Sequence, residues 1–368
     1  MPAPAAVPPE VPELVRAVTV RQFVDRLFQW LGANRILFGH WIEILDPSLA
    51  AAFVFGRGRR VNRVTIGDDL LRRENDLEYA VPFTSFPTLW ARLLLEIQAT
   101  AEAWMDLRLH HYRDASWQEW QGNRAEGEPI PFFGCLLIYT GIDPWDGPGP
   151  LARLVGMPEA LHPVLDRYMP SCHIAYLDLH RTPPDALVSR RTAGGWALRL
   201  VRALVIADPE EFAAEFAAIA GGVAQLPVRQ SVPCRRVFWA MLVVAARRGP
   251  VEYSNLEGIL MNAVAQSPIV GRRQEVAEMG RTMADVWLEQ GLEQGLEQGL
   301  EQGVKGQQNL VLTVLEVRFG KVSPDTADAV RRTLSPERLC EVIAEAVRAQ
   351  DEAAFLALLR HPAGGQSV

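Results

Sequence analysis

Lysine is almost absent from this sequence: of its 368 residues, only Lys305 and Lys321 are lysines. Arginine therefore supplies nearly all of the positive charge, and the formal net charge is −7 at pH 7. This balance excludes a generally basic nucleic-acid-binding protein, so any contact with DNA requires a local basic patch.

Paired cysteines and long apolar runs are also lacking. The longest apolar run, Val237 to Ala246, is too short to cross a bilayer. Residues 1–15 lack the basic and apolar segments of a signal peptide. The cysteines have no paired spacing, which excludes a zinc ribbon and is typical of a reducing compartment: Cys135, Cys172, Cys234 and Cys340. We therefore expect a cytoplasmic protein without a membrane partner.

The segment from Glu74 to Tyr112 organises the rest of the prediction. Asp76 to Val81 alternates between polar and apolar residues, which is typical of a strand with two different faces. Phe83 to Pro87 has the proline and small polar residues of a hairpin loop. Leu89 to Ile97 is almost wholly apolar, which predicts a strand buried on both faces.

Two polar residues, Glu96 and Gln98, end this second strand. They project from one face, because residues i and i+2 of a strand point the same way. If Asp76 lies on the neighbouring strand, two carboxylates ~4 Å apart repel by ~4 kcal/mol at an effective dielectric of about 20. A divalent cation reverses that repulsion, because hard metals such as magnesium bind carboxylate oxygens. The alternative is that Glu96 pairs with one of the arginines and Asp76 caps a turn.

The order of these motifs resembles the PD-(D/E)XK nuclease core, in which an Asp precedes, by about twenty residues, a Glu-x-Lys strand and a helix. It is most similar to the recombination-promoting nuclease (Rpn) family, whose members are also described as putative transposases. Gln98 stands at the lysine position, as in that branch. The family's Asp-x-x-Phe-Lys is present only as Asp25-Arg-Leu-Phe-Gln, without the lysine. The resemblance is carried by Asn75-Asp76-Leu77, Glu96-Ile97-Gln98, Met105 to Tyr112, and Tyr139, Gly141 and Trp145.

This resemblance implies a nuclease that depends on Mg²⁺ or Mn²⁺ held by Asp76 and Glu96. It also implies that Gln98 orients the attacking water, although glutamine cannot act as a base as lysine could. Arg108 and Tyr112 are implied accessory residues on the following helix. Arg108 would either stabilise the transition state or hold Asp76 in place.

A further acidic residue often reaches such a core from a leading helix. Two helical stretches precede the core, and they carry Asp25 and Glu43. Glu43 is the preferred candidate because it lies closer to the core in sequence. The alternative for each is a solvated helix face.

Arginines cluster immediately before the Asp76 strand. They lie in a segment, Phe55 to Ile66, that resembles a loop entering a strand. The cluster predicts a patch that contacts the phosphates of DNA, with a solvated surface loop as the alternative. Its members are Arg57, Arg59, Arg60 and Arg63.

Two more strands complete the predicted core. Pro129 to Gly141 is mostly apolar and ends in glycine, and His173 to Leu179 has a similar pattern. The order strand, strand, helix, strand is the one that the nuclease core needs. We therefore predict an α/β protein with a restriction-endonuclease-like mixed sheet flanked by helices and an all-α C-terminal part.

The predicted domains follow changes in composition. A disordered proline-rich tail over 1–18 precedes the nuclease-like core over 19–185, and helical periodicity then predicts an extension over 186–285. A repeat segment over 286–306 leads to a small helical domain over 307–362.

The repeat itself, Leu288 to Gly303, consists of four copies of Leu-Glu-Gln-Gly. In a helix the leucine row drifts by roughly 40° per copy, and each glycine costs ~1 kcal/mol of helix propensity. One interpretation is a helix that joins copies of the chain into a homo-oligomer, with the glycine row allowing close approach. The other is a flexible spacer.

The sequence thus supports two hypotheses of different classes. The first is a metal-dependent DNA endonuclease that hydrolyses phosphodiester bonds. The second is a catalytically inactive scaffold of the same fold that binds DNA or forms oligomers. The glutamine at position 98 is the residue that divides them.

Overall fold

The computed structural model describes residues 19–61, 64–66, 72–74, 77–124, 126–151, 154–155, 159–165, 168, 170, 173–333 and 335–360. Asp76, Arg63 and the predicted tail over 1–18 lie outside these residues. The chain forms two compact units, residues 1–283 and residues 284–368.

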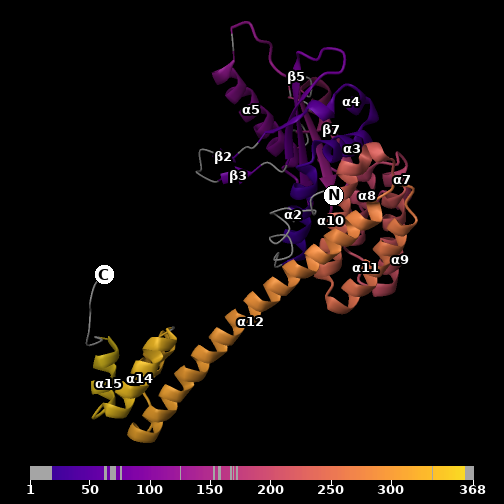
Figure 1. Cartoon of the computed structure of the whole chain (residues 1–368). Helices are drawn as coiled ribbons and strands as arrows, with labels where there is room; N and C mark the ends of the chain where they lie inside the picture. Colours follow the sequence, from indigo (N-terminus) through magenta and orange to yellow (C-terminus); the bar gives the residue numbers. More distant parts are fainter. Residues whose placement is uncertain are drawn as a thin grey trace. The chain divides into compact units, whose positions relative to one another are not determined.

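A five-stranded mixed sheet forms the centre of the first unit (Figure 1). Strands β1, β4 and β5 pair antiparallel, whereas β5, β6 and β7 pair parallel. A separate ribbon pairs β2 (Val64–Ile66) with β3 (Arg72–Glu74). This architecture confirms the predicted α/β fold class. In their order across the sheet, the strands are β1 (Arg59–Val61), β4 (Leu77–Pro82), β5 (Trp90–Gln98), β6 (Phe133–Tyr139) and β7 (Ile174–Asp178).

The elements follow one another as the sequence predicts. Strands β4 and β5 form a hairpin whose loop is closed by the Phe83 amide donating to the Leu89 carbonyl at 3.1 Å. Strands β5 and β6 are parallel and therefore need a crossover, which helix α5 (Met105–Asn123) supplies.

Helix α5 covers one face of the sheet, and we call this side the α5 face (Figure 1). Leu94 and Leu137 of the sheet pack there in one buried cluster with Met105, Leu109 and Tyr112 of the helix. Because side chains alternate along a strand, Glu96 and Gln98 share the α5 face with Leu94.

The opposite face is covered by helices that precede the sheet in sequence. A capping box at Thr19 begins α2 (Val20–Gly32), and the Asn34 side chain caps α3 (Arg35–Leu45). Asp46 followed by Pro47 begins α4 (Pro47–Ala51). A one-turn helix, η1 (Phe55–Arg57), then leads into β1.

Close approach of α2 to β4 depends on Gly32. A Cβ atom at this position would lie 2.2 Å from Cδ1 of Leu77, so a larger residue does not fit without rearrangement. The Tyr79 hydroxyl donates to the Gly32 carbonyl at 2.7 Å, and the Tyr79 ring lies 4.4 Å from that of Phe38 in α3.

The motif after β6 has a packing role. The rings of Tyr139 and Trp145 meet edge to face at 5.0 Å, and the Tyr139 hydroxyl donates to the Asp143 carbonyl at 2.9 Å. The Tyr176 hydroxyl donates to the Trp145 carbonyl at 2.7 Å. A Cβ atom at Gly141 would lie 2.3 Å from the Tyr139 hydroxyl, which explains the glycine. Two short helices, η3 (Glu159–Leu161) and α6 (His162–Leu165), lie between this loop and β7.

Helices complete the first unit after β7. The apolar run from Val237 to Ala246 lies wholly buried inside one of them, which explains its hydrophobicity. The Trp41 indole nitrogen donates to the Gly194 carbonyl at 3.0 Å and so joins α3 to this helical part. The helices are α7 (Pro184–Val188), α8 (Ala193–Ala203), α9 (Pro209–Ala224), η5 (Val228–Gln230), α10 (Ser231–Arg247) and α11 (Pro250–Ala265). Within the described part of the chain, no helix has the length and apolar character needed to span a membrane.

Helix α12 (Arg272–Phe319) is continuous through the Leu-Glu-Gln-Gly repeat, so the predicted helical backbone is confirmed. Its first residue is anchored in the first unit, where the buried Arg272 guanidinium donates to the Ala224 and Leu226 carbonyls at 2.8 and 3.0 Å. Gly320 ends the helix with a φ of 83°, in the left-handed region that favours glycine.

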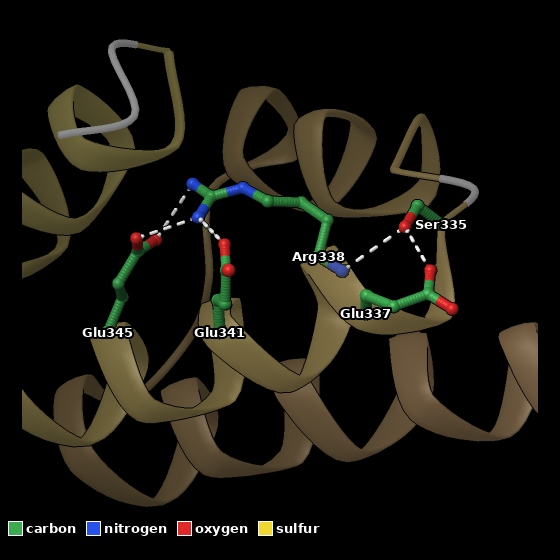
Figure 2. A network of polar contacts seen from close by, with 5 residues as sticks. All are labelled: Ser335, Glu337, Arg338, Glu341 and Glu345. Atoms are coloured by element: carbon green, nitrogen blue, oxygen red, sulfur yellow. Dashed lines mark hydrogen bonds and ion pairs between the residues drawn. The ribbon is translucent and has the colours of Figure 1, made fainter. Parts of the chain in front are cut away.

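The second unit packs the end of α12 against α13 (Pro324–Arg331), α14 (Pro336–Arg348) and α15 (Glu352–Arg360). Ser335 begins α14, and its hydroxyl accepts the Arg338 amide at 3.2 Å (Figure 2). The Arg338 side chain reaches along the helix to Glu341 and Glu345, both at 2.9 Å. The shared core consists of Val311, Leu315, Val330, Leu339, Val342, Ala346, Ala349 and Phe355.

Candidate functional site

Glu96 is a fully buried carboxylate near the C-terminal end of β5, on the α5 face. One oxygen, Oε1, forms an ion pair with the Arg108 guanidinium from the first turn of α5. The other oxygen, Oε2, is buried and has no hydrogen-bond donor among the described residues. A buried carboxylate oxygen without a donor costs roughly 1–3 kcal/mol, so Glu96 has capacity for a further positive or polar partner.

Arg108 joins the polar residues around Glu96. Besides the ion pair with Glu96, its Nη1 donates to Oε2 of Glu102 at 2.8 Å. Its Nε donates to the Tyr112 hydroxyl at 3.0 Å, one helical turn further along α5. The guanidinium also lies over the Tyr112 ring, 5.7 Å from its centre. Both accessory residues implied by the resemblance therefore lie beside Glu96.

Gln98 faces the same group from the end of β5. Its amide nitrogen donates to the Thr100 hydroxyl at 3.3 Å and to Oε2 of Glu102 at 3.4 Å. Both hydrogen bonds are long, so they hold the Gln98 side chain only weakly. The structure thus brings Glu96, Gln98, Arg108 and Tyr112 together.

Glu102 is a member of the group that sequence reasoning missed. It lies in the connection between β5 and α5 and accepts hydrogen bonds from both Gln98 and Arg108. A connection has no periodicity, so no spacing signal marks this residue. The available signal is indirect, namely an acidic side chain within one short connection of Glu96 and Arg108.

A second buried carboxylate on the same face, Glu78 of β4, provides a comparison. Its Oε1 accepts from Arg92 at 3.0 Å and from the Ser116 hydroxyl at 3.4 Å. Glu96 has an equivalent arginine but lacks a second donor for Oε2 among the described residues. Of these two glutamates, Glu96 is the one with unused coordination capacity.

Glu96 could bind a hard divalent cation. Its Oε2 atom accepts no hydrogen bond from a described residue, and carboxylate oxygens are the ligands that Mg²⁺ or Mn²⁺ prefers. Within the described ranges, no group of three or more His, Cys, Asp or Glu side chains has the spacing of a metal site. The second carboxylate predicted from the sequence, Asp76, lies outside the described residues. The last described pair of the β4–β5 ladder is Leu77 with Leu95. In the sequence Leu77 follows Asp76, and Leu95 precedes Glu96.

Glu43, the proposed acidic residue from a leading helix, does not join the group. It lies on α3, which packs on the face opposite α5, and it lines a cavity with His40 and Gln230. The sheet therefore separates Glu43 from Glu96.

The predicted arginine patch is divided by strand geometry. Arg59 pairs with Ala80 and Arg60 with Tyr79, so the two side chains point to opposite faces of the sheet. Arg59 lies over the Trp90 ring at 5.0 Å, whereas Arg60 donates to Gln29 of α2 at 2.9 Å. Arg57 is exposed in η1, and Arg63 lies outside the described residues.

Polar groups that follow β6 and β7 lie at the same end of the sheet as Gln98. The Thr140 amide donates to the Gln98 carbonyl at 2.8 Å, and a ring nitrogen of His180 lies 3.1 Å from the Thr140 carbonyl. Burial lowers the pKa of His180. Asp178 accepts the amides of His180 and Arg181 at 3.0 and 2.9 Å, so its side chain caps the turn after β7.

Comparison with known proteins bears on the same part of the chain. Residues 60–225 match the family model described as "Putative transposase, YhgA-like", a family of the PD-(D/E)XK and Rpn type. The matched range contains β4, β5, α5, β6 and β7, so the resemblance carried by these elements is confirmed. Comparison with curated proteins gives no match, and neither does comparison with solved structures.

Proposed function

Because residues 60–225 match the YhgA-like putative transposases, a family of the PD-(D/E)XK type, we propose that this protein is a metal-dependent DNA endonuclease. It would hydrolyse phosphodiester bonds at the C-terminal end of β5. One observation carries the proposal: the carboxylate oxygen Oε2 of Glu96 is buried and accepts no hydrogen bond from a described residue. In a nuclease core such an atom is suited to bind a cation.

In this proposal Glu96 and Asp76 hold Mg²⁺ or Mn²⁺. When bound, such an ion supplies positive charge to the phosphate and lowers the pKa of a water molecule. Asp76 is bonded to Leu77, and Glu96 to Leu95, and these two neighbours are paired across the sheet.

Arg108 has two carboxylate partners, so it could leave one of them and remain held by the other. In the structure it contacts both Glu96 and Glu102. A cation at Glu96 would replace the charge that Arg108 provides there, while the contact with Glu102 would keep the guanidinium close. From that position Arg108 would stabilise the negative charge that develops on the phosphate in the transition state.

Gln98 would orient the attacking water but would not transfer a proton. Its side-chain amide can donate and accept hydrogen bonds but has no group that takes a proton near neutral pH. Held loosely by Thr100 and Glu102, it would position the attacking water.

Cleavage of a supercoiled plasmid tests the proposal. The purified full chain should nick the plasmid in the presence of Mg²⁺ or Mn²⁺ and not in EDTA. Glu96→Gln should abolish nicking, whereas Glu78→Gln should retain it, provided that circular dichroism shows both variants folded. Equal activity of wild type and Glu96→Gln would reject the site.

A catalytically inactive scaffold is the second candidate. The ion pair between Arg108 and Glu96 favours it, because an arginine can neutralise Glu96 permanently without any metal. The glutamine at position 98 also favours it. Absence of nicking across several metals and DNA substrates, in a folded protein that still binds DNA, would select the scaffold.

A further inference from the structure

A cavity with a basic wall lies away from Glu96, where α3, the connection between α7 and α8, and η5 meet. Its volume is ≈ 670 Å³, and its charged lining residues are Arg190, Arg191, Arg229 and Glu43. None of the three guanidinium groups forms an ion pair or a side-chain hydrogen bond with any residue that the structure describes. Three positive charges thus face one cavity with a single carboxylate beside them, and like charges at close range repel.

Arg191 lines this cavity from a strained backbone. Its φ of 50° lies in the left-handed region, and no other non-glycine residue of the described chain has a positive φ. Such a conformation is unfavourable for a residue with a Cβ atom. The turn is held by the buried side chain of Gln230, whose amide nitrogen donates to the Arg191 carbonyl at 3.0 Å. The fold therefore sustains an unfavourable conformation that places two consecutive arginines at the cavity.

The beginning of α8 adds to the positive character of the wall. The partial positive charge of this helix end favours an anion in the cavity. Its first amides are already used: Ala193 donates to Gln230 at 2.8 Å and Gly194 donates to Nδ1 of His40 at 3.2 Å. Free donors for a ligand must therefore come from side chains.

His40 provides one such donor. Because Nδ1 accepts the Gly194 amide, the ring proton of the neutral form lies on Nε2. His40 lines the cavity, and Nε2 makes no hydrogen bond with a residue in the described ranges. Burial lowers the pKa of His40 to about 4, so the neutral form with a proton on Nε2 predominates at pH 7.

We propose that this cavity binds a phosphate group carried by a nucleotide or a nucleic acid, held by Arg190, Arg191 and Arg229 with His40 as a neutral donor. Guanidinium groups match phosphate oxygens in charge and geometry. The site shares no lining residue with the Glu96 group, and it needs neither the metal nor the cleavage activity proposed above.

Isothermal titration calorimetry on the metal-free full chain tests the proposal, with inorganic phosphate, a mononucleotide and a short DNA oligonucleotide as probes. Wild type should bind at least one of them. Arg191→Gly and Arg229→Gln should each weaken that binding by about tenfold or more, because each removes a charged hydrogen-bond donor. Arg332→Gln, which changes an exposed arginine of the second unit, should bind like wild type.

Arg191→Gly also separates binding from folding. Glycine relieves the left-handed strain, so this variant should melt at the same temperature as wild type or higher. Unchanged affinity in Arg191→Gly and Arg229→Gln, or no binding of any probe by wild type, would overturn the proposal. Tighter binding of the mononucleotide than of the oligonucleotide would identify a small ligand, and the reverse order a nucleic-acid backbone. The titration uses metal-free protein, and the substituted residues lie outside the Glu96 group, so failure of this proposal is distinguishable from failure of the proposed nuclease.

Discussion

Arg108 forms an ion pair with Glu96, a carboxylate with no exposed surface, and at the same time donates to Glu102 at 2.8 Å. Removing a carboxylate from water is costly, so a positive partner stabilises the buried Glu96 in the folded protein. In the structure that partner is Arg108, and in the proposed nuclease it would be a cation. If the proposal holds, Arg108 and the cation would compete for Glu96.

Arg108→Gln should destabilise the metal-free protein, and Mg²⁺ should restore stability. Loss of the guanidinium leaves Glu96 buried without a charge partner, which we expect to cost about 2–4 kcal/mol. A cation bound at Glu96 would return much of that loss through preferential binding to the folded state. Thermal melts with and without Mg²⁺ measure both effects.

Arg92→Gln is the matched control. Arg92 pairs with Glu78 on the same face of the sheet, so this variant should also lose stability. It should gain no more from Mg²⁺ than wild type does, because Glu78 has the Ser116 hydroxyl as a second partner. Equal responses to Mg²⁺ in both variants would show that Glu96 is not a metal ligand.

Asp76→Asn should remove magnesium binding and cleavage without destabilising the metal-free protein. If Asp76 repels Glu96, loss of one negative charge leaves the fold as stable as wild type or slightly more stable. If Asp76 instead caps a turn, the same change costs roughly 1 kcal/mol or more. Melting temperatures of both proteins with and without Mg²⁺ distinguish these cases, and a destabilised variant beside a wild type that ignores Mg²⁺ would contradict the site.

The parts of the fold that were predictable are those with a local pattern. The apolar run before Glu96 and the helical spacing after Met105 predict β5 and α5, and strand alternation puts Glu96 and Gln98 on one face. Ser335 and Gly320 mark a helix start and a helix end in the second unit through cap chemistry that acts within a few residues.

The parts that were not predictable depend on contacts between distant segments. Arg59 and Arg60 are neighbours in sequence, but the strand turns them to opposite faces, so the expected patch is divided. Glu43 is close to the core in sequence and yet lies behind the sheet. Arg191 and Arg229 line one cavity, and the Gln230 side chain joins the two segments by donating to the Arg191 carbonyl, a contact that no spacing rule anticipates.

Stability should fall as the pH falls from about 6.5 toward 4 because of His40. Burial lowers its pKa to about 4 in the folded protein, from the ordinary value of 6.5 for histidine. Between these values the unfolded chain binds more protons than the folded one, so stability is lost as pH decreases and is fully present above pH 6.5. The loss should reach roughly 2–3 kcal/mol.

The control for this effect is His40→Asn, since asparagine offers an acceptor for the Gly194 amide but does not titrate. Urea unfolding at a series of pH values should show a flatter profile for the variant in this window. An identical slope in both proteins would assign the acid sensitivity to other groups.

The Leu-Glu-Gln-Gly repeat should mediate self-association, and helix physics separates its two possible contact rows. Alanine at the repeat glycines raises helix propensity by ~1 kcal/mol per position but adds a methyl group that keeps a neighbouring helix away. Glutamine at the repeat leucines keeps the helix propensity and removes the row of apolar side chains.

If copies of the chain meet along the glycine row, alanine at Gly291, Gly295, Gly299 and Gly303 should lower the mass measured by light scattering. If they meet along the leucine row, the glutamine variant should lower it instead. Deleting residues 288–303 should lower the mass in either case while the first unit keeps its melting temperature, and an unchanged mass in all three proteins would make the repeat a spacer.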